Sequence, residues 1–205
     1  MGVFMEKDLK KEKKVQRREA ADRLKRLSTE YVDSASKSIA RALIDTPEYR
    51  DAGTIFCYMN FGKEVVTDMI IADALSSGKR VCIPLCRGAG IMDARLYTSE
   101  TQLVPGAFGI MEPSADEPVI SPEEIDLAVV PCVTCDRELR RLGHGAGYYD
   151  RFFQEFKGPK IALCLEEMLL DEVVTEEHDV RMDMVISEEK IYDKDSFGEH
   201  RRWRP

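Results

Sequence analysis

The sequence lacks three features that would assign it to a membrane, to nucleic acid or to the secretory route. No stretch approaches the roughly 18 apolar residues that a membrane span needs. Basic residues do not predominate, because 30 Lys and Arg stand against 38 Asp and Glu, whereas a general nucleic-acid binder needs a basic surface. The first residues run into lysines without an apolar region, which argues against a secretory signal peptide. We therefore expect a cytoplasmic protein that binds neither membrane nor nucleic acid.

Internal repeats and low-complexity segments are also missing, which excludes solenoid and linker-like architectures. The 205 residues are enough for one compact domain with its own core and few for two. Hydrophobic residues make up 43% of the chain, too many for a disordered protein, although only 8% of the residues are aromatic. The composition predicts a single folded domain.

Six cysteines lie mostly inside apolar runs. They are Cys57, Cys82, Cys86, Cys132, Cys135 and Cys164. In an acidic chain of this size they indicate reduced, buried thiols rather than a disulfide framework. Cys132 and Cys135 have the spacing of a redox or zinc pair, but no second pair with that spacing accompanies them. The sequence therefore favours core cysteines at a strand end, with metal or redox use as the alternative.

The first part of the chain is basic, although the whole chain carries a net charge of −8. Residues 7–26 hold ten basic and four acidic residues. Helix-forming residues without Pro or Gly predict a helix over about 7–27, with only a partial apolar stripe. A solvated helix face is the ordinary interpretation of such a run, and the lack of interleaved aromatics argues against RNA contact. Ser28 and Glu30 then predict the start of a second helix, which a proline ends near Asp45.

Short apolar runs later in the chain predict the strands of a buried sheet. They lie at residues 54–59, 80–84, 91–97, 126–131, 160–165 and 182–187. Helical runs at 64–77 and 147–156 alternate with them, which implies parallel pairing with right-handed crossovers. We predict one α/β domain over 1–205, with an open, largely parallel sheet flanked by helices in a Rossmann-like three-layer arrangement. The proline-rich stretch 98–122 is expected to be a long functional loop, and 197–205 a loosely held tail.

Three glycines alternate between a predicted strand and a predicted helix, at Gly143, Gly145 and Gly147. This spacing lets successive N–H groups converge, and the following helix adds the positive end of its dipole. Arg141 can neutralise phosphate oxygens, and Asp150 can reach Mg²⁺ bound to those oxygens. The segment matches neither the Walker A sequence nor the dinucleotide fingerprint. The pattern favours a nucleoside triphosphate, with a plain glycine-rich turn as the alternative.

Several motifs, in the same order along the chain, resemble the 5-formyltetrahydrofolate cyclo-ligase family, whose members are also called 5,10-methenyltetrahydrofolate synthetases. The most specific motif is RLGHGAGYYD at 141–150, preceded by an apolar strand, a proline and a downstream aspartate within 126–136. The others are YMNFGKEVVT at 58–67, GAFGIMEP at 106–113, and His178-Asp179 with Asp183. The resemblance runs from the basic segment to Ser187, which is nearly the whole chain.

This resemblance implies a ligase of folate one-carbon metabolism that uses ATP as co-substrate and Mg²⁺ as cofactor. It would convert 5-formyltetrahydrofolate, with or without a polyglutamate tail, to 5,10-methenyltetrahydrofolate and release ADP and phosphate. An N-formyl group is a poor electrophile, so its oxygen is first phosphorylated and N10 then attacks the iminium phosphate. The alternatives are an enzyme that activates another pterin or formamide, and a nucleotide-binding regulatory paralogue without turnover. No obligate protein partner is evident.

The resemblance also implies roles for individual residues. ATP would contact Lys13 and Arg17, one helical turn apart, and then Arg141, Leu142, Gly143, His144, Gly145, Ala146, Gly147, Tyr148 and Tyr149. The folate would contact Met59, Glu64, Phe108, His144, Gly145, Ala146, Gly147 and Tyr148. Asp150 and Asp179 would hold Mg²⁺, and the catalytic residues would be Arg141, His144 and Asp150.

Several of these residues also have a purely structural interpretation. Without the resemblance, Asp179 would belong to a surface turn and Glu64 would be an ordinary acid at a helix N-terminus. Phe108 would pin its loop to the core. Ala146 stands where many family members have Gly or Lys, and the region before Arg141 lacks the usual glycine. These departures leave room for a paralogue with altered specificity.

Overall fold

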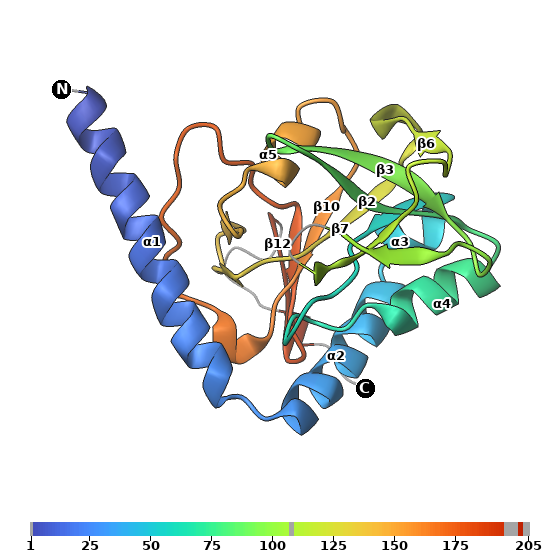
Figure 1. Ribbon diagram of the computed structural model, residues 1–205. Helices are drawn as coiled ribbons and strands as arrows, with labels where there is room; N and C mark the ends of the chain where they lie inside the picture. Colours follow the sequence, from blue (N-terminus) through green and yellow to red (C-terminus); the bar gives the residue numbers. More distant parts are fainter. Residues whose placement is uncertain (1, 107–108, 195–200, 203–205) are drawn as a thin grey trace.

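The computed structural model describes residues 2–106, 109–194 and 201–202, and it is built around a nine-stranded sheet (Figure 1). The strands, in spatial order, are β13 (Arg201–Arg202), β12 (Lys190–Asp193), β11 (Met184–Ile186), β10 (Lys160–Leu163), β7 (Leu127–Val130), β1 (Thr54–Cys57), β2 (Arg80–Gly88), β3 (Ile91–Tyr97) and β6 (Val119–Ile120). The five central strands from β11 to β2 are parallel, and antiparallel strands extend both edges. The predicted open sheet with a parallel centre is confirmed.

Helices lie on both faces of the sheet, as a three-layer fold requires. Phe56 of β1 stacks on Phe152 of α5 (Tyr148–Phe152), with ring centroids 4.7 Å apart. The next residue, Cys57, interacts instead with Thr67, which precedes α4 (Asp68–Ser76). Adjacent strand residues point to opposite faces, so α5 and α4 cover opposite sides of β1. The strands β1 and β7 between these layers are entirely buried, as continuous apolar runs predict.

The two N-terminal helices form a V, and the first arm of the V lies along one side of the domain (Figure 1). Helix α1 (Gly2–Arg26) contains the predicted basic helix and begins earlier. Helix α2 (Thr29–Ile44) begins where predicted, because the Ser28 side chain accepts a hydrogen bond from the backbone N–H of Tyr31 at 3.1 Å. Its apolar face packs into the core, and Asp45 forms its C-cap.

Two predicted helix boundaries need correction, and one further helix was not predicted. The helix expected at 64–77 begins only at α4, because residues 61–64 form a turn in which Glu64 Oε2 accepts the backbone N–H of Phe61. Helix α5 ends at Phe152 rather than at residue 156. The proline that ends α2 also begins a further helix, α3 (Pro47–Asp51), since proline suits the first helical position.

The stretch 98–122, expected to be one long loop, contains further strands. Besides β6 it holds a two-stranded antiparallel ribbon, β4 (Leu103–Pro105) with β5 (Met111–Pro113). The expectation for Phe108 falls outside the described residues, as does most of the predicted tail 197–205, of which only Arg201–Arg202 is described. Among the helices described, none has the length and apolar character that crossing a bilayer requires.

Candidate active site

The glycine loop follows β9 (Arg141–Leu142) and leads into α5, at the carboxyl-terminal side of the central strands. Gly145 and Gly147 have φ values of +99° and +70°, which residues with a side chain rarely adopt. A Cβ atom added to Gly145 would lie 3.1 Å from the guanidinium carbon of Arg17. Glycine at both positions therefore gives the loop its curl and lets α1 approach closely.

Arg17 of α1 is the residue that joins this helix to the glycine loop. Its Nε donates to the carbonyl oxygen of Gly143 at 2.7 Å. The exposed loop residues 144–146 follow directly, and the carbonyl of Ala146 accepts a hydrogen bond from Arg151 at 2.9 Å. The structure thus brings together the two elements that were predicted to bind phosphate from opposite ends of the chain.

Arg141 lies buried at the base of the loop. Its Nη2 lies 3.3 Å from Oδ1 of Asp150, and its Nη1 lies 3.2 Å from the carbonyl oxygen of Pro131. Its guanidinium carbon stands 5.5 Å from the ring centroid of Tyr149, in cation–π geometry. Only 4% of the side chain is exposed, so these contacts orient a permanent positive charge at the strand end that precedes the loop.

Lys13 lies one helical turn before Arg17 and is buried between two carboxylates. Its Nζ lies 2.6 Å from Oε2 of Glu176 and 2.5 Å from Oδ2 of Asp179. The exposed fractions of the three side chains are 7%, 9% and 14%. The predicted ATP contact and the predicted metal ligand are thus direct partners, and sequence reasoning missed Glu176, although it stands only three residues before Asp179.

The carboxylates around Asp179 suit a hard divalent cation as well as an ammonium group. Oxygens of Glu176 and Asp179 and a ring nitrogen of His178 lie within 4.8 Å of one another. Oε1 of Glu176 is buried and has no hydrogen-bond partner in the described part of the chain. Asp150 approaches the same segment, because its Oδ1 accepts the backbone N–H of Val180 at 3.5 Å. Oxygen donors are those that Mg²⁺ prefers, so this region fits the predicted ion.

A cavity of about 270 Å³ opens beside the loop and is lined by both polar and apolar side chains. Glu64 and His144 face each other in its wall, with Oε1 and Nε2 3.6 Å apart. Burial raises the pKa of Glu64 from 4.5 to about 7. Desolvation and the nearby cations Arg141 and Arg17 lower the pKa of His144. Glu64 therefore titrates near neutral pH, and each member of the pair donates or accepts hydrogen bonds according to its protonation.

The other predicted site residues that the structure describes are not part of the lining of this cavity, apart from Arg17. Met59 follows β1 and packs against the core, and Tyr148 begins α5. Leu142 is buried in β9. Tyr149 packs against Phe56, with ring centroids 6.2 Å apart, so it is a core residue on at least one side.

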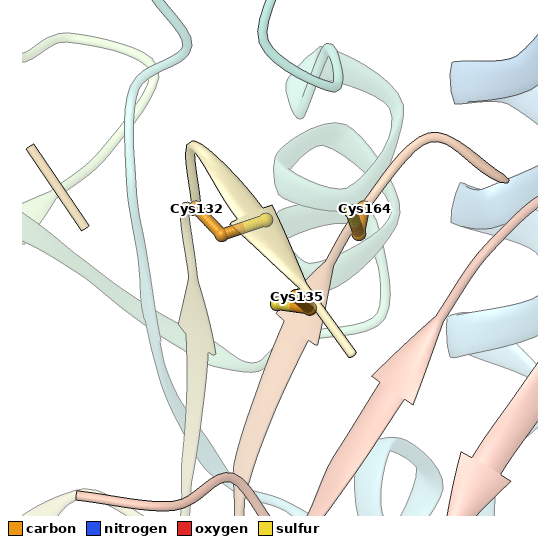
Figure 2. Close-up of side chains that lie close together, drawn as sticks. All are labelled: Cys132, Cys135 and Cys164. Atoms are coloured by element: carbon orange, nitrogen blue, oxygen red, sulfur yellow. The ribbon is translucent and has the colours of Figure 1, made fainter. Parts of the chain in front are cut away.

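Two groups in the cavity wall were not predicted as site residues. Lys63 donates to the backbone carbonyl of Leu27 at 2.6 Å, and so ties the wall to the turn between α1 and α2. Cys132 and Cys164 also line the cavity, and their sulfurs converge with that of buried Cys135 (Figure 2). The spacing of Cys132 and Cys135 was a signal for this cluster, but Cys164 joins it only through sheet pairing.

Comparison with known proteins agrees with the resemblance in the motifs. The model of a family described as "5-formyltetrahydrofolate cyclo-ligase family" matches residues 9–188. A probable 5-formyltetrahydrofolate cyclo-ligase of Schizosaccharomyces pombe is 32% identical over 185 residues, which cover 82% of this chain and 91% of that protein. The 5-formyltetrahydrofolate cyclo-ligase of Mus musculus is 30% identical over 186 residues, covering 84% and 92%. The NMR structure of Aquifex aeolicus 5,10-methenyltetrahydrofolate synthetase superposes with a TM-score of 0.79 at 26% identity, covering 94% and 96%.

Proposed function

The chain belongs to the 5-formyltetrahydrofolate cyclo-ligase family, and on that premise we propose that it is a cytoplasmic enzyme that converts 5-formyltetrahydrofolate to 5,10-methenyltetrahydrofolate. ATP is the co-substrate and Mg²⁺ the cofactor, and ADP and phosphate are released. The observation that chiefly supports this function is the 3.6 Å approach of His144, in the phosphate-type loop, to Glu64 in the cavity wall. A loop suited to phosphate and a pocket suited to a flat polar ring thereby share one wall.

The reaction needs positioning more than a nucleophilic side chain. The formyl oxygen attacks the γ-phosphorus of ATP, the bond from that phosphorus to the β-phosphate bridge breaks, and ADP leaves. N10 of the folate then attacks the carbon of the resulting iminium phosphate. It loses its proton, and phosphate departs with the former formyl oxygen. In both steps negative charge moves onto or away from phosphate oxygens. Fixed cations and backbone N–H groups therefore stabilise the transition states.

The phosphate side is assigned to the cations and the glycine loop. Lys13 and Arg17 on α1 and the buried Arg141 bring positive charge to residues 143–149 from two directions. The positive φ of Gly145 turns the loop backbone so that its N–H groups can donate to phosphate oxygens. Lys13 leaves its carboxylate partners when it takes up a phosphate oxygen, so nucleotide binding exchanges one set of ion pairs for another.

Asp150 and Asp179 are assigned to Mg²⁺, beside the buried, unpartnered oxygen of Glu176. When bound, the ion neutralises phosphate charge and favours transfer of the γ-phosphoryl group. Arg141 holds the carboxylate of Asp150 in position from the other side. Departure of Lys13 from Glu176 and Asp179 frees acidic oxygens in the same region at the same time.

The folate side is assigned to Met59, Glu64, Phe108 and the loop residues 144–148. Glu64 has a pKa of about 7 in a pocket it shares with apolar side chains. A carboxyl group at this pKa accepts hydrogen bonds from the N–H groups of a pterin when it is ionised, and it also donates when it is protonated. Arg141, His144 and Asp150 are the catalytic residues in this assignment, because they lie in or directly beside the loop assigned to the phosphates.

The test is near-ultraviolet absorbance, because the methenyl product absorbs there and the formyl substrate does not. We expect the signal to grow only when protein, ATP, Mg²⁺ and 5-formyltetrahydrofolate are all present. Growth without ATP would contradict the phosphorylation step. Absence of growth, with nucleotide still bound in equilibrium dialysis, would favour a regulatory paralogue. Release of ADP with another pterin or formamide, but not with 5-formyltetrahydrofolate, would favour an enzyme that activates that other substrate.

A further inference from the structure

Three cysteines from neighbouring strand ends gather their sulfurs beside the cavity (Figure 2). Cys132 follows β7, Cys164 follows β10, and Cys135 lies in the short strand β8 (Thr134–Cys135). Because β7 and β10 are parallel neighbours, their carboxyl ends lie at one edge of the sheet. The three sulfur atoms all lie within 4.8 Å of one another. All three cysteines are free thiols.

We propose that Cys132, Cys135 and Cys164 form a binding site for a thiophilic metal ion of the Zn²⁺ or Cd²⁺ type. A tetrahedral zinc–thiolate site has Zn–S bonds of about 2.3 Å, which puts its sulfurs roughly 3.8 Å apart. Sulfurs already within 4.8 Å reach that spacing by small rotations of the side chains. Three protein ligands also leave one coordination position for water or for a group in the cavity.

The surroundings of the cluster favour bound metal over three packed thiols. Cys135 pairs with Arg141 across β8 and β9, so a permanent cation stands beside the sulfurs. A divalent ion bound by all three cysteines would displace their three thiol protons and leave a complex of charge −1. Arg141 offsets that charge.

The cavity supplies a route for the ion. Cys132 is partly exposed, and both Cys132 and Cys164 line the cavity wall, whereas Cys135 is fully buried beneath them. The thiols now point to backbone carbonyls, with Cys132 Sγ 3.2 Å from the oxygen of Leu163 and Cys164 Sγ 3.5 Å from that of Leu165. These weak bonds are easily exchanged for metal–sulfur bonds.

Occupancy of this site would change the cavity. Glu64 and His144 line the same cavity as Cys132 and Cys164, so a bound ion reduces the space for an organic ligand. If the cavity takes the folate, as proposed above, Cd²⁺ or Zn²⁺ becomes an inhibitor that competes with the folate. That consequence depends on the proposed function, whereas the metal site itself does not.

The experiment is a titration of the full-length, reduced, chelator-free protein with Cd²⁺, followed by thiolate-to-metal charge-transfer absorption in the ultraviolet. We expect the band to saturate at one ion per chain in wild type and in the control Cys86→Ser, whose thiol lies outside the cluster. In Cys132→Ser the affinity should fall by more than about 100-fold, since even groups that only orient a metal ligand contribute 10–100-fold. Cys132 is partly exposed, so this variant should keep the wild-type circular dichroism.

Two results would overturn the proposal. One is a wild-type protein that shows no charge-transfer band, and the other is a Cys132→Ser variant that keeps the full band. The absorption readout is independent of turnover, so a protein without cyclo-ligase activity can still bind Cd²⁺, and an active one can fail to.

Discussion

The ammonium group of Lys13 lies 2.5 Å from Oδ2 of Asp179, although 166 positions separate the two residues in the sequence. Glu176 completes the arrangement at 2.6 Å from the same nitrogen. Lys13 is one of only two buried residues of α1, among those whose side chains are described, and the other is Ala20. This ion pair therefore attaches the basic helix to the segment that contains Glu176 and Asp179, at the place where the residues proposed to bind phosphate and metal meet.

Replacement of Lys13 by glutamine should destabilise the protein by about 3 kcal/mol, because two buried carboxylates lose their cation. Urea denaturation at pH 7 would measure the difference. Lys14→Gln is the matched control, since the neighbouring side chain is exposed and its loss should change stability by less than about 0.5 kcal/mol. Equal denaturation midpoints for the two variants would show that the Lys13 ion pairs contribute nothing.

Replacement of Glu64 by glutamine should stabilise the protein at alkaline pH and leave it unchanged at acid pH. Burial raises the pKa of Glu64 from 4.5 to about 7, so the folded state holds a proton that the unfolded state has lost. The contribution of this group to stability therefore declines as pH rises from 4.5 through 7. At pH 8 the neutral glutamine should be more stable than wild type by about 1–3 kcal/mol.

Denaturant midpoints at pH 4.5 and pH 8 would check this sign. Glu123→Gln, a change at an exposed carboxylate, serves as the control and should show no such difference between the two pH values. A Glu64→Gln variant that is less stable than wild type at pH 8 would contradict the raised pKa.

Arg141→Ala and Asp150→Asn should each lower kcat/KM by about 100-fold or more, as expected when one group that stabilises transferring charge is removed. Asp150→Asn keeps the shape of the side chain and should keep the fold. Arg141 is buried, so Arg141→Lys is a second variant that retains charge but loses the planar fork toward Asp150 and Pro131. Arg50→Ala, on the exposed surface, is the control.

Kinetics by near-ultraviolet absorbance, with circular dichroism on each variant, would separate chemistry from folding. Turnover within about threefold of wild type in both Asp150→Asn and Arg141→Lys would refute the site assignment, since removal of even one stabilising donor ordinarily lowers the rate by 10²–10³.

The buried strands and the glycine loop were predictable because their signals are local. A four-residue apolar run such as Leu127–Val130 is stable only when it is buried in the core. The backbone of Gly145 has a positive φ, which favours glycine at that position of the loop. The start of α4 was not predictable, because the turn before it depends on Glu64 bonding back to the chain. No local pattern distinguishes that turn from a first helical turn.

The site was predictable only in part, for a related reason. Spacing alone indicated phosphate chemistry around Arg141 and Asp150, but the proposed roles of Lys13 and Asp179 came from the family resemblance. The contact between these last two residues follows from how α1 docks, which the partial apolar stripe of the helix does not specify. Glu176 lies beside Lys13, and Cys164 lies beside Cys132 and Cys135, only because of tertiary packing. No sequence motif therefore predicts either contact.

The docking of α1 also bears on protein synthesis. A ribosome that has released the first helix must add more than a hundred and fifty further residues before the partners of Lys13 emerge. Until then the ammonium group of Lys13 lacks the carboxylates of Glu176 and Asp179, and a prematurely terminated chain would carry the helix without its counterpart. Attachment of the helix by this ion pair is therefore completed only near the end of translation.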